Sequence, residues 1–348
     1  MLDSTSQLLL RHDVLQPDTW LVNAQDNLGQ HEQLTSHFYY ANLHARYAMP
    51  DDSFAAELPH RSQPVVLYVP KEKPLFWMIL ANLAACLAPN VPVYLVGSNK
   101  GGIKSLVKTL PEQWTPAQKV ASGNHCLLFK MERTEQPAEA FVLHNFQSEY
   151  EVAVDSSSAS SVRVVNLPGV FSDQKMDVGT AELLAYISTR PAPPVATNAP
   201  LRVLDFACGS GVIGAVIRQL MADQASTPCS LTACDISAMA LHCCALTLRN
   251  QALPSPYQVI ASDGLNEVSG QYDWIVSNPP FHAGQKTDYT IAEQFFHDAA
   301  KRLSRRGRLT IVANSFLGYN ELLERHFKHV VEVVNTRKYK IIEASQPC

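Results

Sequence analysis

The stretch Asp205-Phe206-Ala207-Cys208-Gly209-Ser210-Gly211-Val212-Ile213-Gly214 joins an apolar run to a helical pattern. It contains a G-x-G-x-x-G sequence, and Asp235 stands at the end of the next apolar run. Glycine lets a backbone turn tightly and approach a ligand closely, and the N-terminus of the following helix favours a negative group. A strand, a glycine turn, a helix and an acidic strand end predict a parallel α/β fold that holds a nucleotide-like ligand.

Short apolar runs alternate with helical patterns along the rest of the chain. This alternation predicts two α/β domains in tandem, each a mostly parallel, Rossmann-like sheet flanked by helices. We place them at residues 1–160 and 161–348, because a serine-rich stretch at 155–161 has the composition of a linker or a hairpin loop. An Asn-Thr-Arg-Lys turn at 335–338 predicts an antiparallel hairpin that closes the second domain. The predicted strands are 65–69, 91–96, 126–129, 150–154, 162–166, 202–206, 231–234, 259–261, 274–276, 308–313, 330–334 and 339–342.

Composition excludes several classes of protein. The net charge of −4 is unusual for a protein that grips bare nucleic acid by charge alone. No apolar run reaches the roughly 20 residues of a membrane span, and Met1-Leu2-Asp3-Ser4 lacks the basic start of a signal peptide. The eight cysteines form no Cys-x-x-Cys pair, which argues against a metal site. We expect a cytoplasmic protein without a membrane partner, and two fused domains favour a monomer.

A second motif, Ser277-Asn278-Pro279-Pro280-Phe281-His282, follows another apolar run. The two prolines fix φ and remove two backbone donors, and Asn278 is pushed out of the helical region. The result is a stiff corner with an amide, exposed carbonyl oxygens and an aromatic ring. Asn278 Oδ1 and the Pro279 carbonyl could each accept one N–H of an exocyclic amine while Phe281 stacks on its ring. Such contacts favour the charge that develops on the nitrogen during methyl transfer. A rigid turn that only caps a strand is the plainer alternative.

The glycine turn suits NAD as well as S-adenosylmethionine. Asp205 and the Asn-Pro-Pro-Phe corner favour S-adenosylmethionine, since the corner has no role in hydride transfer. In the D-x-G-x-G-x-G pattern of class I methyltransferases, which these residues resemble, the acid orients the methionine amino end. Ala207 replaces the first glycine, and alanine resists positive φ. The residues expected to contact the cofactor are Asp177, Gly179, Thr180, Asp205, Ala207, Gly209, Gly211, Asp235, Ile236, Asp263 and Gly264.

Some of these residues have structural alternatives. Asp235 is expected to accept hydrogen bonds from ribose hydroxyls, and Asp263 to face the adenine amino group or to cap a helix. Asp177 either approaches the methionine carboxylate or is an ordinary N-cap. For His282, the roles of proton acceptor, RNA contact and loop residue stay open. Arg337, Lys338 and Lys340 are candidates for substrate phosphates.

These motifs resemble the ribosomal RNA small subunit methyltransferase C family, the guanine-N2 methyltransferases of 16S ribosomal RNA. The resemblance extends over nearly the whole chain and includes Leu167-Pro168-Gly169-Val170-Phe171-Ser172 and Ile311-Val312-Ala313-Asn314-Ser315-Phe316. It implies a guanine of 16S rRNA in the 30S subunit as substrate, oriented by Asn278, Pro279, Pro280 and Phe281. It also implies that the first domain is a degenerate copy that supports the fold and holds RNA. The turn Gly97-Ser98-Asn99-Lys100-Gly101-Gly102 agrees, since no acid precedes it.

Four other functions stay open. A guanine of 23S rRNA would be served by a closely similar enzyme. DNA adenine and protein glutamine methyltransferases also use Asn-Pro-Pro corners, although usually with tyrosine. An NAD-dependent oxidoreductase could use the same glycine turn. A non-catalytic RNA-binding protein would bind RNA whether or not Asn278 is present.

Overall fold

The computed structural model describes residues 2–24, 26, 28–32, 34, 36–37, 62–155, 160–171, 175–195, 199–224, 228–280 and 289–348. Contacts divide the chain into two compact units, one ending at Gln147 and the other comprising Ser148–Cys348. The boundary expected at 160/161 would separate β7 (Ser148–Ala153) from β8 (Ser161–Asn166), two strands that pair in an antiparallel hairpin within the second unit.

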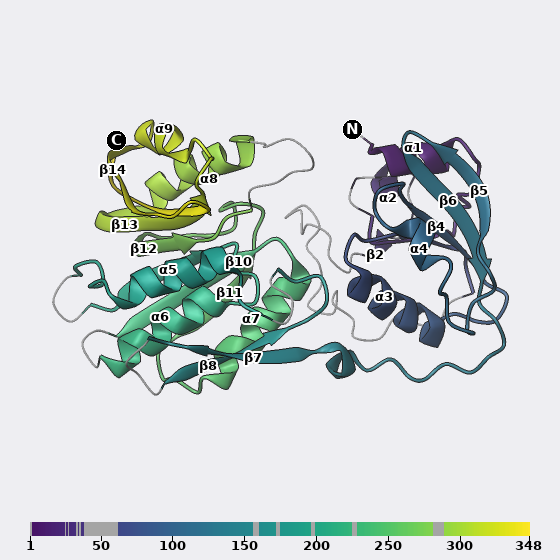
Figure 1. Cartoon of the computed structure of the whole chain (residues 1–348), viewed down its shortest axis with the longest axis horizontal. Coiled ribbons are helices and arrows are strands. Elements are labelled where there is room, and N and C mark those ends of the chain that lie inside the picture. Colours follow the sequence, from purple (N-terminus) through teal and green to yellow (C-terminus); the bar gives the residue numbers. More distant parts are fainter. Residues whose placement is uncertain are drawn as a thin grey trace. The chain divides into compact units, whose positions relative to one another are not determined.

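The first unit contains a sheet with the order β2-β1-β3-β4-β6-β5 (Figure 1). Its first four strands are parallel, whereas β6 pairs antiparallel with both β4 and β5. The strands expected at 65–69, 91–96 and 126–129 are present as β3, β4 and β6. Its elements are α1 (Ser4–Leu10), β1 (Trp20–Val22), α2 (Leu28–His31), β2 (Ser36–His37), β3 (Val65–Tyr68), α3 (Lys73–Cys86), β4 (Pro92–Ser98), α4 (Ile103–Leu106), β5 (Gln118–Gly123), β6 (Cys126–Glu132) and the 3₁₀ turn η1 (Leu143–Phe146).

The second unit contains a sheet with the order β11-β10-β9-β12-β13-β15-β14 (Figure 1). Strands β11 to β13 are parallel, and β15 enters antiparallel between β13 and β14. The expected terminal hairpin is therefore confirmed. The elements after β8 are α5 (Val178–Ser188), β9 (Leu201–Phe206), α6 (Val212–Asp223), β10 (Cys229–Asp235), α7 (Ala238–Asn250), β11 (Tyr257–Ala261), β12 (Tyr272–Ser277), α8 (Tyr289–Arg302), β13 (Leu303–Asn314), α9 (Tyr319–Glu324), β14 (Phe327–Asn335) and β15 (Tyr339–Pro347).

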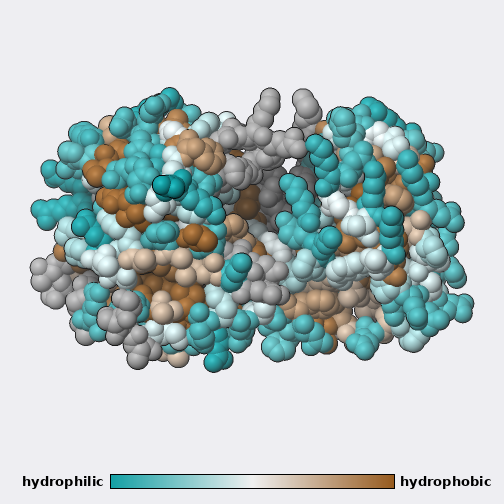
Figure 2. All heavy atoms as spheres, in the orientation of Figure 1, coloured by the Kyte–Doolittle hydropathy of each residue, from teal (hydrophilic) through white to brown (hydrophobic). Residues whose placement is uncertain are grey.

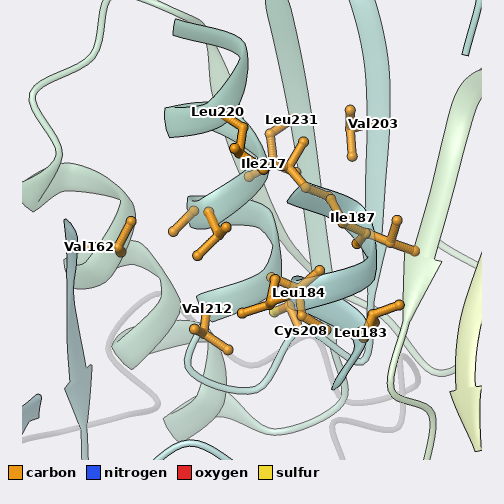
Figure 3. Close-up of a cluster of buried hydrophobic side chains, with 14 of the residues drawn as sticks. Val162, Leu183, Leu184, Ile187, Val203, Cys208, Val212, Ile217, Leu220 and Leu231 are labelled. Carbon is orange, nitrogen blue, oxygen red and sulfur yellow. The ribbon is translucent and has the colours of Figure 1, made fainter. Parts of the chain in front are cut away.

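Helices cover both faces of this sheet, because its central strands carry apolar side chains on both sides. On β9, Val203 joins a buried cluster with α5, α6 and α7, whereas the next residue, Leu204, joins a separate cluster with α8 and α9. Figure 3 shows the first cluster, with Leu184 of α5 close to Cys208 of the glycine turn. The glycine turn is therefore packed against a hydrophobic core. On the surface, hydrophobic residues lie in separate patches between hydrophilic ones (Figure 2).

Candidate active site

Both sequence motifs begin at the same edge of the second sheet. Strands β9 and β12 are parallel neighbours in which Phe206 pairs with Ser277. The Ser277 hydroxyl donates to the Phe206 carbonyl over 2.8 Å, which joins the two strand ends. The glycine turn after Phe206 and the corner that starts at Asn278 therefore leave the sheet from adjacent positions. In open α/β sheets the carboxyl ends of the strands are where ligands bind.

The turn after β9 needs backbone angles that L-residues seldom adopt. Gly209 has φ of +55° and Gly211 has +80°, and Ala207 adopts +54°. The position where alanine replaces glycine thus lies in the left-handed region. That conformation costs a residue with a Cβ about 1–2 kcal/mol, so the turn forms despite local strain.

The glycines of the site fall into two groups. A Cβ placed on Gly209 or on Gly264, whose φ is +63°, would meet no atom within 4 Å. A Cβ on Gly211 would lie only 2.6 Å from Cys244 Sγ. Gly211 is therefore required for packing, whereas Gly209 and Gly264 border open space where a ligand can approach the backbone closely. This arrangement fits a nucleotide-like cofactor.

Asp205 anchors the helix after the turn. Its side chain is 0% exposed, and Oδ2 accepts from the Gly214 amide over 2.8 Å. Oδ1 has no hydrogen-bond partner within the described ranges. Burial raises the pKa of Asp205 to about 7, with the Gly214 hydrogen bond opposing this shift and the nearby Asp235 adding to it. The expected contact to the methionine amino group stays a prediction.

Asp235 ties the glycine turn to the next strand end. Its Oδ2 accepts from the Gly209 amide and its Oδ1 from the Ser237 amide, each over 2.9 Å. Burial raises the pKa of this carboxyl, although these bonds and one from the Ile236 amide lower it. The half-buried carboxylate is thus fixed beside Gly209, and its contact with ribose hydroxyls stays a prediction.

Asn278 is held in one orientation by the start of α5. Its Nδ2 donates to Asp177 Oδ2 over 3.2 Å and to Thr180 Oγ1 over 3.0 Å. Asp177 is also the N-cap, since the same oxygen accepts from the Thr180 amide over 3.1 Å. An ionised carboxylate only accepts, so the amide nitrogen must face it and Oδ1 must point away. Asp177 and Thr180 thus place their side chains against Asn278, and their expected contact with the cofactor stays a prediction.

Tyr339 packs against the first turn of α5, a contact that no local sequence pattern predicts. A Cβ on Gly179 would lie 3.0 Å from Tyr339 Cε1 and 3.0 Å from Asp177 Oδ2. Glycine at this position thus lets the ring pack closely against the first turn of α5. The sequence could not reveal this contact because it joins residues far apart in the chain.

The remaining candidates lie around the same strand ends. Asp263 and Gly264 follow β11, and both are half-buried. Pro279 is buried and Pro280 is exposed. Phe281 and His282 fall outside the described residues, so their expected roles stay predictions.

The basic candidates separate into two groups. Arg337 and Lys338 are exposed at the hairpin turn between β14 and β15. Lys340 is only 6% exposed, and its Nζ donates to Asn320 Oδ1 over 2.8 Å and lies 3.7 Å from Glu332 Oε2. The expectation that Lys340 contacts substrate phosphates is therefore wrong, because β15 turns its side chain into the protein.

Among the described residues, no group of three or more His, Cys, Asp or Glu is placed to hold a metal ion. Within the same ranges, no helix is both long and apolar enough to cross a membrane.

Residues 161–343 match the model of the methyltransferase small domain, and residues 6–150 match that of the methyltransferase small domain N-terminal family. A protein of Shewanella baltica (strain OS195) named ribosomal RNA small subunit methyltransferase C is 39% identical over 296 residues, which cover 83% of this chain and 79% of the relative. The chain belongs to the ribosomal RNA small subunit methyltransferase C family.

A relative of the same name from Idiomarina loihiensis is 37% identical over 281 residues, covering 81% of this chain and 78% of the relative. The fold matches a 16S rRNA N2 methyltransferase from T. thermophilus, solved in complex with AdoMet and guanosine. The TM-score is 0.80 at 20% identity, with 99% of this chain and 92% of that chain covered. The likeness extends through both units, so the tandem architecture is that of the solved protein.

Proposed function

We propose that this protein transfers a methyl group from S-adenosylmethionine to the exocyclic N2 amine of a guanine in 16S ribosomal RNA. The observation that carries the proposal is the orientation of Asn278. Asp177 and Thr180 hold its Nδ2, so Oδ1 is the acceptor presented at the edge where the glycine turn begins. An oriented carbonyl oxygen beside a cofactor turn is what methylation of an amine requires, and the family relationship supplies the class of substrate.

The residues around Gly209 fit S-adenosylmethionine. When bound, the cofactor supplies an electrophilic methyl group on a sulfonium. Gly209 and Gly264 leave room for it against the backbone, and Asp235 stands where ribose hydroxyls would donate to its carboxylate. Asp205 would act mainly through the position of α6, since one of its oxygens is bonded to Gly214.

The corner residues would stabilise the transition state. The lone pair of the guanine N2 is delocalised into the ring, which makes the amine a poor nucleophile. Asn278 Oδ1 and the Pro279 carbonyl would each accept one N–H, favouring a nitrogen that is becoming pyramidal and positive. With the amine held there, the methyl group that the cofactor supplies would pass to N2 as its bond to sulfur breaks, leaving S-adenosylhomocysteine. The methylated nitrogen then loses one proton to solvent, and no strong base is needed.

The substrate RNA and the role of the first unit follow from the same family relationship. The RNA would be presented within the 30S subunit, with the target base flipped out of its stack. The first unit would not bind the cofactor, because its turn between β4 and α4 has no carboxylate before it. It would support the fold and hold RNA. A monomeric state and a cytoplasmic location belong to the same proposal.

The test is methyl transfer from radiolabelled S-adenosylmethionine to 30S and 50S subunits of cells that lack this protein. Asn278→Ala should lower kcat about a hundredfold, the size of effect expected for one group that contacts developing charge. Asn250→Ala is the matched control, since Asn250 is exposed at the far end of α7, away from the Ser237 end that faces the site. The melting temperature should rise with S-adenosylhomocysteine in all three proteins.

Label on a 16S guanine, lost in Asn278→Ala and kept in Asn250→Ala, supports the proposal. Label confined to 23S RNA would overturn the target while keeping the chemistry. Stabilisation by NADH and not by S-adenosylhomocysteine would overturn the reaction itself.

A further inference from the structure

Phe316 is an exposed aromatic residue on a rigid turn. Its side chain is 72% exposed, whereas Leu317 and Tyr319, which follow it, are each 1% exposed. The Leu317 amide donates to the Asn314 carbonyl over 3.0 Å and closes the turn that follows β13. The ring therefore stands outside the core while its neighbours are anchored in it. Single exposed apolar residues are common, so the surroundings of Phe316 decide what it can do.

The turn that carries Phe316 is bonded to the basic hairpin turn. The Ser315 amide donates to the Lys338 carbonyl over 3.0 Å, and the Ser315 hydroxyl donates to the Thr336 carbonyl over 2.8 Å. These bonds reach the residues on both sides of Arg337. The backbone that carries the exposed side chains of Arg337 and Lys338 is thus fixed next to the residue that precedes Phe316.

A continuous set of contacts joins this hairpin to the catalytic corner. Lys338 Nζ lies over the Tyr339 ring, 5.1 Å from its centroid. The same ring packs on Gly179, beside the Asp177 carboxylate that holds Asn278. Strand β13 also lies next to β12 and parallel to it, so both lead to the same edge of the sheet. Phe316 and the two cations therefore border the candidate active site.

We propose that Phe316, Arg337 and Lys338 bind the single-stranded RNA beside the target guanine, with a neighbouring base stacked on Phe316 and its phosphates against the two cations. This inference rests on the proposed function, because flipping a guanine leaves its neighbours unstacked. Aromatic rings flanked by cations are the common means of holding unpaired RNA. In a chain with net charge −4, attraction to phosphate depends on local sets of cations such as this one.

The first experiment compares Phe316→Ala, Phe316→Leu and Phe316→Trp in methyl transfer to 30S subunits. Loss of one stacked base predicts a rise of roughly tenfold in KM for Phe316→Ala and Phe316→Leu, whereas Phe316→Trp stays near wild type. Val331→Ala is the control, because Val331 is also exposed but lies within β14. Equal activity of the leucine and tryptophan variants, with only alanine impaired, would overturn base stacking in favour of an apolar protein contact.

A second experiment does not depend on turnover. The fluorescence that the new tryptophan of Phe316→Trp adds to that of wild type should be quenched by a short single-stranded oligoribonucleotide and much less by a blunt RNA duplex. Arg337→Ala and Lys338→Ala should each reduce the dependence of log K on log salt by about 0.7. Arg305→Ala and Arg306→Ala should not, since these exposed cations lie near the opposite end of β13.

The two proposals can fail separately. If wild-type protein transfers no methyl group to RNA but the tryptophan is quenched, the RNA-binding surface is supported and the proposed function is overturned. If methyl transfer is intact, Phe316→Ala behaves as wild type and no quenching occurs, only the surface is overturned.

Discussion

Asn278 Nδ2 lies 3.2 Å from Asp177 Oδ2, so the residue that caps α5 also orients the amide at the end of β12. The two residues belong to different elements and are far apart in the sequence, so no local sequence pattern predicts their contact. The same carboxylate oxygen accepts from the Thr180 amide, which ties the orientation of the amide to the first turn of the helix. The N-cap, the first turn of α5 and Asn278 are thereby joined in one hydrogen-bonded unit.

We therefore expect Asp177→Ser and Thr180→Val each to lower kcat about tenfold, which corresponds to about 1.4 kcal/mol of transition-state stabilisation. Serine preserves the N-cap but is too short to hold Asn278, and valine removes the Thr180 hydroxyl at nearly constant size. The KM for S-adenosylmethionine should stay within about twofold if the two residues act through Asn278. Steady-state kinetics measures both quantities.

Two controls separate the orientation of Asn278 from the stability of α5. Asp177→Ala removes the cap as well and should cost about 1 kcal/mol in urea denaturation, which Asp177→Ser should not. In Asn278→Ala, adding Thr180→Val should have little further effect on kcat, because residues that act as a unit are not additive. Fully additive losses would show that Thr180 acts by another route, such as direct cofactor contact.

Ala207 is the position where the glycine turn departs from its usual sequence, with φ of +54°. Ala207→Gly should increase the free energy of unfolding by about 1 kcal/mol, because glycine adopts this angle without a Cβ clash. Ala185→Gly is the matched control: Ala185 is exposed in α5, where glycine should cost about 1 kcal/mol. Equal effects of the two substitutions in urea denaturation would contradict strain at Ala207.

Gly211 and Gly209 should respond differently to alanine. Gly211→Ala places a Cβ 2.6 Å from Cys244 Sγ, so we expect a loss of stability of about 2–4 kcal/mol from strain and overpacking. Cys244→Ala should recover part of it. Gly209→Ala meets no protein atom, so its stability loss should be limited to about 1–2 kcal/mol of backbone strain while cofactor affinity falls. Denaturation and calorimetric titration with S-adenosylhomocysteine measure the two effects.

Asp205 makes stability depend on pH. Burial raises its pKa to about 7 from an unfolded value near 3.8, so the folded protein binds this proton more tightly. Its contribution is therefore complete below about pH 4 and is lost as the pH rises toward about 7. Across that range, wild type should lose roughly 1.4 kcal/mol per pH unit relative to Asp205→Asn, the slope for one proton.

Asp273 provides the control for this pH dependence. Burial alone would raise the pKa of Asp273, but hydrogen bonds from Arg202 and Ser304 leave it below its ordinary value. Its contribution is thus lost only as the pH falls below about 4. Asp273→Asn should therefore change stability by a constant amount between about pH 4 and 7. A flat difference for Asp205→Asn as well would show that Asp205 is ionised throughout.

Much of the second unit could be predicted from the sequence, because local patterns set its elements. The glycines at 209, 211 and 214, followed by a helix, and Asp235 at a strand end are local signals, and the structure has the corresponding elements. The Asn-Thr-Arg-Lys turn likewise predicts the hairpin of β14 and β15. Periodicity and turn chemistry were sufficient for these features.

Other features depend on contacts between distant segments. The sequence predicts a boundary after residue 160, whereas β7 pairs with β8 across the serine-rich stretch and belongs to the second unit. The sequence predicts an exposed cation at Lys340. In β15, however, successive side chains point to opposite faces, and that of Lys340 points inward. The hydrogen bonds from Asn278 to α5 join residues that only the tertiary fold brings together.

The position of β15 between β13 and β14 has a consequence for the order of folding. Among the described strands, β14 pairs only with β15, although β14 is made first. During synthesis, β13 and β14 must remain apart until the strand that separates them has emerged. The sheet is therefore completed by insertion rather than by addition at its rim, and a nascent chain that stops before Tyr339 leaves β13 with an open edge on which another chain could pair.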